Sequence, residues 1–201
     1  MIIKTLFPKS LKMMQKNLEV PIKLITTKNL KNYTKWYVHP AVQYLSGVHK
    51  ADYFRIYFLL YYGGGYSDIK RHSFSWKFAF DEFRNPNTWV IGVPEILGGV
   101  ASPPHVDLSA SFDVLISNGF FIARPGNEYF AKVHARQNVI LDKKWEILKQ
   151  YPASNALCQY DCPKYPLRCA ELLGEIMSEY GLMFNEHLSR TLPMPDLSNY
   201  R

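Results

Sequence analysis

Three charged side chains stand out between His49 and Arg71, because most of their neighbours are apolar or aromatic. Asp52 and Arg55 are the only charged residues in the segment 51–62, and a spacing of three places them on one face of a helix. Asp68 follows thirteen positions after Arg55. An unpaired buried charge is costly, so these groups need partners. They form either a structural ion pair with a separate turn aspartate, or a polar pocket that receives a sugar and a phosphate.

The elements around these residues predict how they are positioned. The segment Lys50–Tyr62 contains no Gly or Pro and reads as a buried helix. Three glycines, 63–65, then end the helix, because they disfavour it and allow turns that other residues resist. We predict a short strand over Tyr66–Lys70. Alternation along that strand would place Tyr66, Asp68 and Lys70 on one face.

This pattern resembles the core motif of the sugar transferases with a DXD signature, which include capsular-polysaccharide and mannosyl enzymes and the glucosylating clostridial toxins. The family pattern is approximately D-x-x-R-x-x-x-L-x-x-x-G-G-x-Y-x-D-x-D. The matching residues are Asp52, Arg55, Leu59, Gly63, Gly64, Tyr66 and Asp68. The chain is also similar to glycosyltransferase domains of large algal viruses (chloroviruses).

The resemblance implies a GT-A-like α/β fold, with a central, mostly parallel (mixed) sheet flanked by helices in a single domain. It implies a nucleotide-sugar donor, of which a UDP-sugar is favoured, and a divalent metal, Mn²⁺ or Mg²⁺. By the same resemblance, Asp52 and Arg55 would bind hydroxyl groups of the donor sugar. Asp68 would bind the ribose and the metal–diphosphate, next to Tyr66.

The chain departs from the family pattern at Lys70, which stands where the second motif aspartate would be. That aspartate is commonly a direct metal ligand, so we expect metal binding to persist but to be weaker, through Asp68 and a distant ligand. His187 is the imidazole available near the C-terminus. The leaving nucleoside diphosphate carries about two to three negative charges that must be neutralised. Lys70 and Arg71 are the alternative to a metal.

Three further site residues are predicted from the expected order of elements. Strands over Ile2–Phe7 and Pro21–Thr27 would open a parallel sheet, whose ligands bind near the carboxyl ends of the strands. In GT-A folds that corner holds the base, which makes Phe7 and Thr26 candidate base contacts; ordinary turn chemistry is the alternative. Asn118 would lie between two strand segments of Phe112–Ala123, either facing the reacting sugar or forming a plain turn.

The remaining elements are predicted from patterning and turn residues. A strand covers Thr88–Val93, and Leu97–Ser111 is a long polar loop. Helices are expected near 75–83, after the cap Asn127 through Val139, over Lys143–Gln150, and over Leu167–Tyr180 with Gly181 as C′ residue.

Composition narrows the class of protein. A chain of 201 residues with 47% hydrophobic and 20% charged residues is globular and large enough for one core, so we expect one domain over 1–201. Three cysteines cannot all pair within the chain, which favours a reducing compartment. The chain has no run of eighteen apolar residues and no secretory signal pattern. We therefore expect a cytoplasmic protein, in the host cytoplasm if it is viral.

The net charge of +7 makes nucleic-acid binding a rival function. The spacing of the lysines is typical of a solvated face. Alternatively, these lysines attract an anionic membrane surface or an anionic donor. The sequence thus predicts a glycosyltransferase that retains the anomeric configuration and acts on a glycan or glycoprotein acceptor. Its rivals are a metal-independent transferase using Lys70 and Arg71, a single-stranded nucleic-acid binder, and an inactive sugar-binding module.

Overall fold

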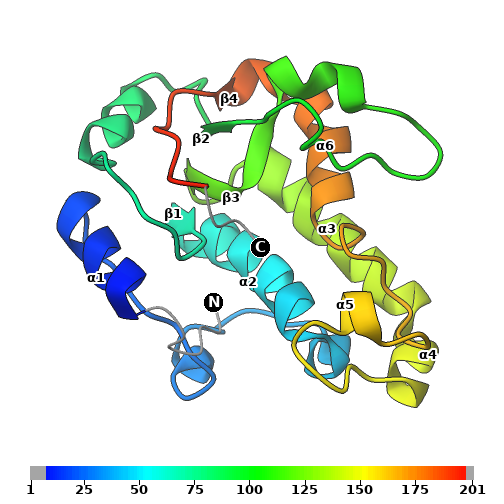
Figure 1. Ribbon diagram of the computed structural model, residues 1–201. Coiled ribbons are helices and arrows are strands. Elements are labelled where there is room, and N and C mark those ends of the chain that lie inside the picture. The colour runs from blue at the N-terminus through cyan, green and yellow to red at the C-terminus, as the bar shows by residue number, and fades with distance from the viewer. Residues whose placement is uncertain (1–7, 198–201) are drawn as a thin grey trace.

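A computed structural model describes residues 8–197 of the chain (Figure 1). Its α-helices are α1 (Pro8–Asn17), α2 (Gly47–Tyr62), α3 (Glu128–Lys143), α4 (Trp145–Gln150), α5 (Cys158–Asp161) and α6 (Gly174–Met183). Its strands are β1 (Gly64–Ser67), β2 (Val90–Pro94), β3 (Ile116–Ala123) and β4 (Leu188–Ser189). Short 3₁₀ helices lie at Leu30–Asn32, Pro40–Tyr44, Lys77–Arg84, Ser109–Val114 and Asn185–His187.

The four strands form one mixed sheet in the order β1-β3-β2-β4. β3 is antiparallel to both β1 and β2, and only β4 is parallel to its neighbour β2. The predicted mixed α/β architecture is therefore confirmed, whereas the predicted excess of parallel pairing is wrong for the described strands. The apolar runs that suggest parallel strands arise here because both faces of the sheet are covered.

Helices cover the sheet on its two faces (Figure 1). On one face, Phe121 of β3 packs in a cluster with Ile56 of α2, Phe130 of α3 and Ile176 of α6. On the other face, the neighbouring strand residues pack with α1 and Trp76 in a cluster of Met14, Leu18, Trp76, Ile91, Val93, Phe120, Ile122 and Leu192. Successive β3 side chains thus enter different cores, as strand alternation requires.

Helix α2 confirms the predicted central helix and adds one turn at its start. Ser46 caps it by accepting a hydrogen bond from the backbone N–H of His49. Gly63 ends it with φ +67°, a left-handed value that favours glycine, and a Cβ there would lie 2.7 Å from the Pro125 ring. The helix and its glycine stop therefore follow from local sequence chemistry.

Strand β1 begins and ends earlier than predicted. Two of the three glycines, Gly64 and Gly65, belong to it. A Cβ at Gly65 would lie only 2.8 Å from Ile122 of β3, so the close approach of β3 requires glycine at that position. The strand ends at Ser67, and one further hydrogen bond joins the Asp68 N–H to the Gly119 carbonyl. Lys70 lies beyond the regular strand, so the predicted alternation does not fix the direction of its side chain.

Strand β3 runs without a break from Ile116 to Ala123, so the predicted turn at Asn118 is wrong. Asn118 and Gly119 lie where the register with β2 shifts, between the pairs Gly92–Phe121 and Pro94–Ile116, so their turn preference is met by an irregularity within the strand. The predicted strand Pro21–Thr27 has no strand assignment, and Ile2–Phe7 lies outside the described residues.

In the C-terminal part, Asn127 caps α3 as predicted, with its side chain accepting from the Phe130 N–H. Helix α6 begins at Gly174 rather than near Leu167, and it includes Gly181, which was predicted to follow it. A Cβ at Gly181 would lie 2.7 Å from Leu115, so close packing explains this glycine rather than a helix end.

The three cysteines do not all pair, as their odd number requires, but two of them form a disulfide, which a reducing compartment does not favour. Cys158 and Cys162 form a disulfide, because the short helix α5 brings their Cα atoms to 4.8 Å, and Cys169 is free and exposed. None of the helices within 8–197 combines the length and the apolar character needed to cross a membrane.

Candidate functional site

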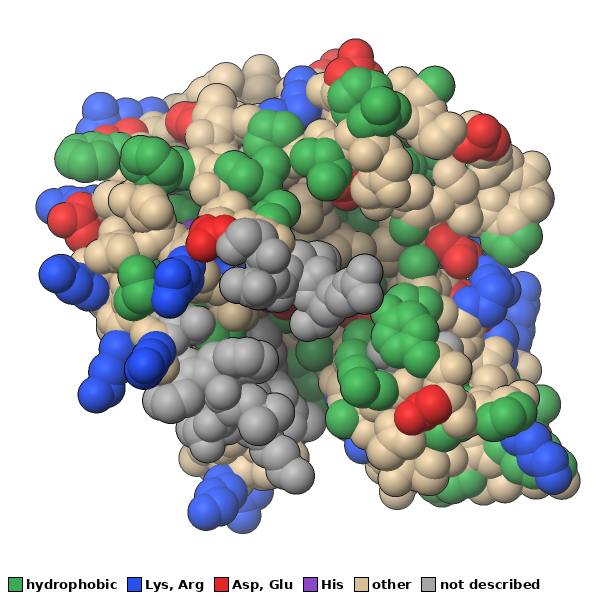
Figure 2. Space-filling view, viewed as in Figure 1, with side chains coloured by type: hydrophobic (Ala, Val, Ile, Leu, Met, Phe, Trp, Pro, Cys, Tyr) green, Lys and Arg blue, Asp and Glu red, His purple; other side chains and the backbone are tan. Residues whose placement is uncertain are grey.

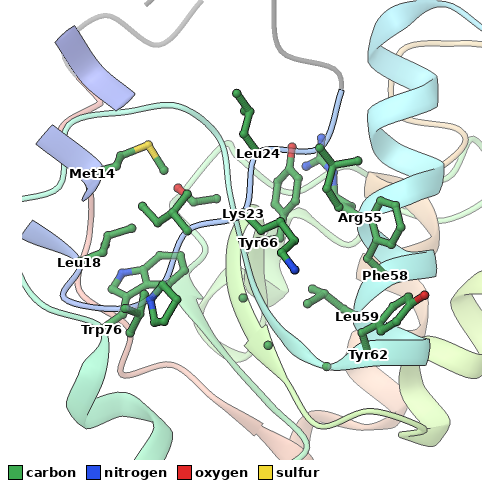
Figure 3. A pocket seen from close by; sticks show the side chains of 18 of the residues that line it. Met14, Leu18, Lys23, Leu24, Arg55, Phe58, Leu59, Tyr62, Tyr66 and Trp76 are labelled. Carbon is green, nitrogen blue, oxygen red and sulfur yellow. The ribbon is translucent and has the colours of Figure 1, made fainter. Parts of the chain in front are cut away.

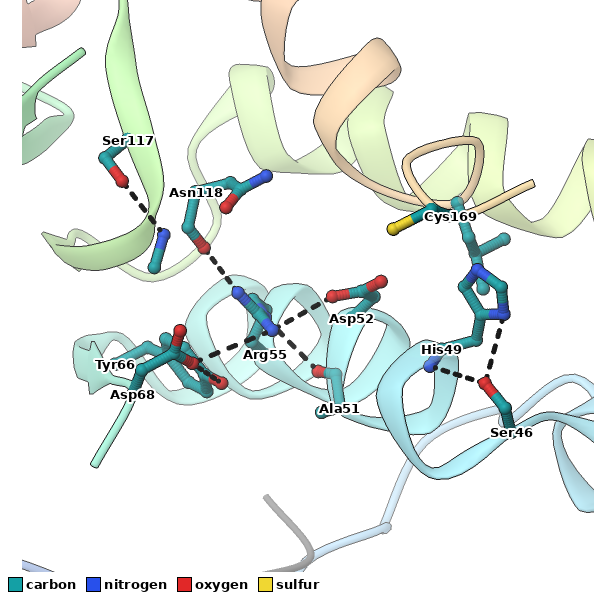
Figure 4. A network of polar contacts seen from close by, with 12 residues as sticks. Ser46, His49, Ala51, Asp52, Arg55, Tyr66, Asp68, Ser117, Asn118 and Cys169 are labelled. Carbon is teal, nitrogen blue, oxygen red and sulfur yellow. Dashed lines mark hydrogen bonds and ion pairs between the residues drawn. The ribbon is translucent and has the colours of Figure 1, made fainter. Parts of the chain in front are cut away.

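Asp52, Arg55 and Asp68 converge, as their spacing predicts (Figure 4). One guanidinium nitrogen of Arg55, Nη2, lies 2.9 Å from an Asp52 carboxylate oxygen and 4.0 Å from one of Asp68. The Arg55 and Asp52 side chains are only 7% and 9% exposed, whereas the Asp68 side chain is 27% exposed. Asp68 is therefore the carboxylate that an incoming ligand can reach more easily.

Tyr66 connects the guanidinium to the second carboxylate. Its hydroxyl donates a 2.8 Å hydrogen bond to Asp68 Oδ1, and its ring faces the Arg55 guanidinium at 4.3 Å. Burial raises the pKa of the Tyr66 hydroxyl well above its usual value, so the group stays protonated and remains a donor. Tyr66 thus fixes the orientation of Asp68.

Burial also dominates the protonation of Asp52. It raises the pKa of this carboxyl to about 6, although the neighbouring Arg55 lowers it and Asp68 raises it further. Asp52 is therefore ionised at neutral pH and becomes neutral in mildly acidic solution. In its ionised form it is an acceptor for hydroxyl groups, such as those of a sugar.

Asn118 joins this cluster from strand β3. Its main-chain carbonyl accepts a hydrogen bond from Arg55 Nη1 (Figure 4). Its side-chain amide lies against the start of α6, where a Cβ at Gly174 would be 3.0 Å from Nδ2. The predicted position of Asn118 beside Asp52 and Arg55 is thus found, but Asn118 lies within strand β3, at the register shift with β2, rather than in a turn.

A cavity of about 710 Å³ adjoins the cluster, and Arg55 and Tyr66 form part of its wall (Figure 3). The glycines 63–65 and the segment 20–25 also line it, so the backbone can approach a ligand closely there. Most of its lining side chains are apolar or aromatic, and two lysines, Lys23 and Lys77, line it besides Arg55. Such a cavity suits a ligand with a flat ring and a negative charge.

One polar atom in the cavity wall has no partner within the described part of the chain. Trp76 is buried at 2% exposure, and its indole Nε1 makes no hydrogen bond there. Lys23, Lys77 and Trp76 were not predicted as site residues. No local motif marks them, because Lys23 and the neighbours Trp76 and Lys77 come from two segments that only the tertiary fold joins.

The buried amide of Gln137 in α3 contacts the backbone next to the charged cluster, and this residue was likewise not predicted. Its Nε2 donates to the Asp52 carbonyl (3.1 Å) and to the Leu172 carbonyl (2.9 Å). It therefore ties α2 at Asp52 to the segment before α6. A single glutamine inside an amphipathic helix carries no signal of this role.

Two predicted site residues lie elsewhere. His187 precedes β4, at the sheet edge opposite to β1, where its ring stacks on Trp89 at 3.6 Å and its Nδ1 lies 2.8 Å from the Asn87 carbonyl oxygen. The structure therefore does not bring it to Asp68. Thr26 forms a turn in which its N–H donates to Asn29 Oδ1 at 2.7 Å, and it does not line the cavity.

Three other predicted residues have a weaker relation to the cluster. Lys70 is half-buried and lies two positions after Asp68, past the end of β1. Arg71 is exposed, and its backbone forms a bridge to Asp196. Phe7 lies outside the described residues.

The carboxylate oxygens of the cluster suit a divalent metal only if a bound substrate supplies further oxygen ligands. Mg²⁺ is usually held by one or two carboxylates plus substrate phosphates and water. Asp68 provides one accessible carboxylate. Over residues 8–197, the one group of three potential metal ligands that meets geometric limits is Cys158, Asp161 and Cys162, and both of its sulfurs are in the disulfide.

The comparisons with known proteins agree with this geometry. Residues 7–73, about a third of the chain, match the family model described as "Glycosyltransferase sugar-binding region containing DXD motif". The match includes Asp52, Arg55, Tyr66 and Asp68. Searches of curated proteins and of solved structures return no match. The resemblance to the DXD-containing sugar transferases is therefore confirmed over residues 7–73, which are similar to the sugar-binding region of that family. The similarity to domains of large algal viruses stays a prediction.

Proposed function

We propose that this glycosyltransferase takes a sugar from a nucleoside diphosphate sugar, with UDP as the favoured nucleotide, and transfers it to a glycan or glycoprotein acceptor. One observation carries the proposal: two carboxylates meet the guanidinium of Arg55, and Arg55 lines a cavity of about 710 Å³. A purely structural ion pair would not need a third charged group or an adjoining cavity.

In the proposed reaction, ionised Asp52 and Arg55 hold hydroxyl groups of the donor sugar and orient its ring. Breaking the bond between the anomeric carbon and the phosphate oxygen leaves positive charge on the sugar and negative charge on the diphosphate. The nearby carboxylates favour the first charge, and cations favour the second. In a reaction with retention, the acceptor oxygen forms the new bond on the same face. The departing phosphate then takes the acceptor proton, so no separate base is required.

The nucleotide would occupy the cavity. Tyr33, Phe58 and Tyr62 line it and offer aromatic faces on which a base can stack. The backbone at glycines 63–65 gives the diphosphate room to approach Asp68. Lys23 and Lys77 are placed in the same wall and supply positive charge.

For the metal, we propose that Mn²⁺ or Mg²⁺ binds at Asp68 only together with the donor diphosphate, which would complete the ligand set. When bound, the ion would neutralise charge on the leaving group. The rival is neutralisation by Lys70 and Arg71 without a metal. Calorimetry separates the two: we expect no Mn²⁺ binding to the protein alone and clear binding in the presence of UDP. Full turnover after exhaustive chelation would favour the rival.

The function itself is tested by a thermal-shift screen against UDP- and GDP-sugars, followed by measurement of UDP release. A ligand that binds only the folded protein raises the unfolding midpoint. We expect a UDP-sugar to raise it in the wild type and in the control Asp113→Asn, an exposed aspartate, but not in Asp52→Asn. Absence of any shift with all nucleotide sugars would contradict the proposal. Binding without UDP release in the presence of acceptors would indicate an inactive sugar-binding module.

A further inference from the structure

The net charge of the chain is concentrated in its first 37 residues. This part contains eight lysines, no arginine and one acidic residue, Glu19, and therefore carries +7. That equals the net charge of the whole protein. The remaining residues, 38–201, contain sixteen basic and sixteen acidic residues and have no net charge.

The structure exposes these charges and leaves them uncompensated. All seven lysines in the described part, which we call the lysine surface, are exposed: Lys9, Lys12, Lys16, Lys23, Lys28, Lys31 and Lys35. Within residues 8–197 none of them is ion-paired, whereas Lys144, Lys149, Arg84 and Arg168 all have carboxylate partners. In Figure 2 the lower left edge, where α1 and the segment 28–35 lie in Figure 1, shows basic side chains without acidic ones between them.

Large apolar side chains are exposed in the same part of the chain. Trp36 is 44% exposed, Tyr37 63% and Met13 37%. The Trp36 ring is held by stacking on Tyr61, with ring centroids 4.6 Å apart. Trp and Tyr favour the boundary between lipid and water, because their rings are apolar and their N–H or O–H groups stay hydrated.

We propose that the lysine surface binds the anionic surface of a phospholipid bilayer, with Trp36 and Tyr37 at the level of the headgroups. Lysines without arginine act as separate point charges, which suits a diffuse layer of lipid phosphates and carboxylates. Proteins that recognise nucleic-acid bases, or that bind phosphates through two hydrogen bonds, rely more on the planar guanidinium of arginine. This segment contains no arginine. The protein would lie on the membrane and not span it.

This contact would also set the position of the cavity. Lys23 belongs to the lysine surface and lines the cavity, and its ammonium lies 5.1 Å from the Tyr33 ring centre. The apolar cavity residues Leu11 and Met14 come from α1, which carries three of the other lysines. The bilayer would therefore face the same segment that forms one wall of the cavity, which favours acceptors presented at a membrane.

The test is vesicle co-sedimentation of the full chain, with phosphatidylcholine vesicles that contain either 30% or no phosphatidylserine. The variant Lys28→Gln/Lys31→Gln/Lys35→Gln is compared with Lys132→Gln/Lys143→Gln/Lys149→Gln, a control with the same net charge whose lysines are also exposed. Each lysine near an anionic membrane is worth about a fivefold change in partitioning. We expect the first variant to bind roughly a hundredfold more weakly, and the control to bind nearly as the wild type does.

Other outcomes would overturn the proposal. They are wild-type binding independent of phosphatidylserine, equal losses in the two variants, or tighter binding at 150 mM salt to a single-stranded oligonucleotide than to the vesicles. Equal unfolding midpoints of the two variants show that both are folded. UDP-sugar binding is measured in parallel, so that failure of membrane binding is distinguished from failure of the proposed transferase function.

Discussion

Replacing Arg55 with Met tests the buried charge cluster directly. Methionine keeps an unbranched apolar stem but removes the guanidinium that faces Asp52 at 2.9 Å. Removing one partner of a buried ion pair typically costs about 3–5 kcal/mol, because the other charge stays buried without compensation. Asp52 can reduce this cost by taking up a proton, so the loss of stability depends on pH.

The direction in which stability changes with pH follows from the raised pKa of Asp52. A carboxyl whose folded-state pKa lies above its unfolded value of 3.8 destabilises the protein progressively as pH rises between the two values. In the wild type this decline ends near pH 6, where folded Asp52 ionises. In Arg55→Met the pKa rises further, because Arg55 lowers it. The free energy of unfolding should therefore keep falling above pH 6, by about 1.4 kcal/mol per pH unit.

The assay is urea unfolding at several pH values between 5.5 and 8, with tryptophan fluorescence as the signal. Each variant is compared with the wild type at the same pH, so that titrations shared by both, such as those of the buried His72 and His134, cancel. The double variant Asp52→Asn/Arg55→Met has no carboxyl at this position and should recover stability at pH 8. A loss in Arg55→Met that is independent of pH, or that Asp52→Asn does not relieve, would refute the reasoning.

Three further predictions concern the same cluster. Tyr66→Phe removes the hydrogen bond to Asp68, so it should lower the free energy of unfolding by about 1 kcal/mol and weaken donor binding. If calorimetry gives the wild-type donor affinity, Tyr66 does not orient Asp68 for binding. The kcat/KM of the wild type should fall about tenfold per pH unit below pH 6, as Asp52 becomes protonated, and a flat profile from pH 5 to 7 would contradict this. Gly65→Ala places a Cβ 2.8 Å from Ile122 Cγ2 and should destabilise the protein by about 1–3 kcal/mol, and an unchanged thermal midpoint would show that β1 can move away from β3.

The part of the site that could be predicted from sequence is the part that is local. The i,i+3 pair Asp52–Arg55, its helix and the glycine stop all depend on residues close in the chain. Asp68 follows after a short strand, so its approach to Arg55 can also be predicted from the sequence pattern. Family resemblance added the chemical interpretation, because spacing alone left a structural ion pair equally open.

The part that could not be predicted depends on long-range packing. Asn and Gly favour a turn at Asn118, but the chain continues as strand β3 and accommodates these residues at a register shift with β2. Lys23 and Trp76 reach the cavity from segments with no motif. His187 is the opposite case: its residue type suits a metal, but the order of strands places it at the far edge of the sheet.

The start of α6 is a further feature that the sequence pattern does not predict. Apolar spacing predicted a helix from Leu167, but the chain before Gly174 is shaped by polar contacts that no periodicity reveals. Glu171 pairs with Lys144 at 2.8 Å, and Gln137 binds the Leu172 carbonyl. These partners lie on α3 and at its end, so only the assembled fold specifies the irregular segment.

The contacts of Arg55 have a consequence for how the site forms during folding. The Asp52–Arg55 pair lies within α2, so it can form as soon as this helix does, which is a fast step. Asp68 follows β1, which pairs only with β3 among the described strands, and the Asp68 N–H donates to the Gly119 carbonyl of β3. The Asn118 carbonyl, 63 positions from Arg55, also belongs to β3. The charged cluster should therefore assemble in two stages, with the ion pair inside the helix first, and Asp68 and the Asn118 carbonyl together when β3 docks.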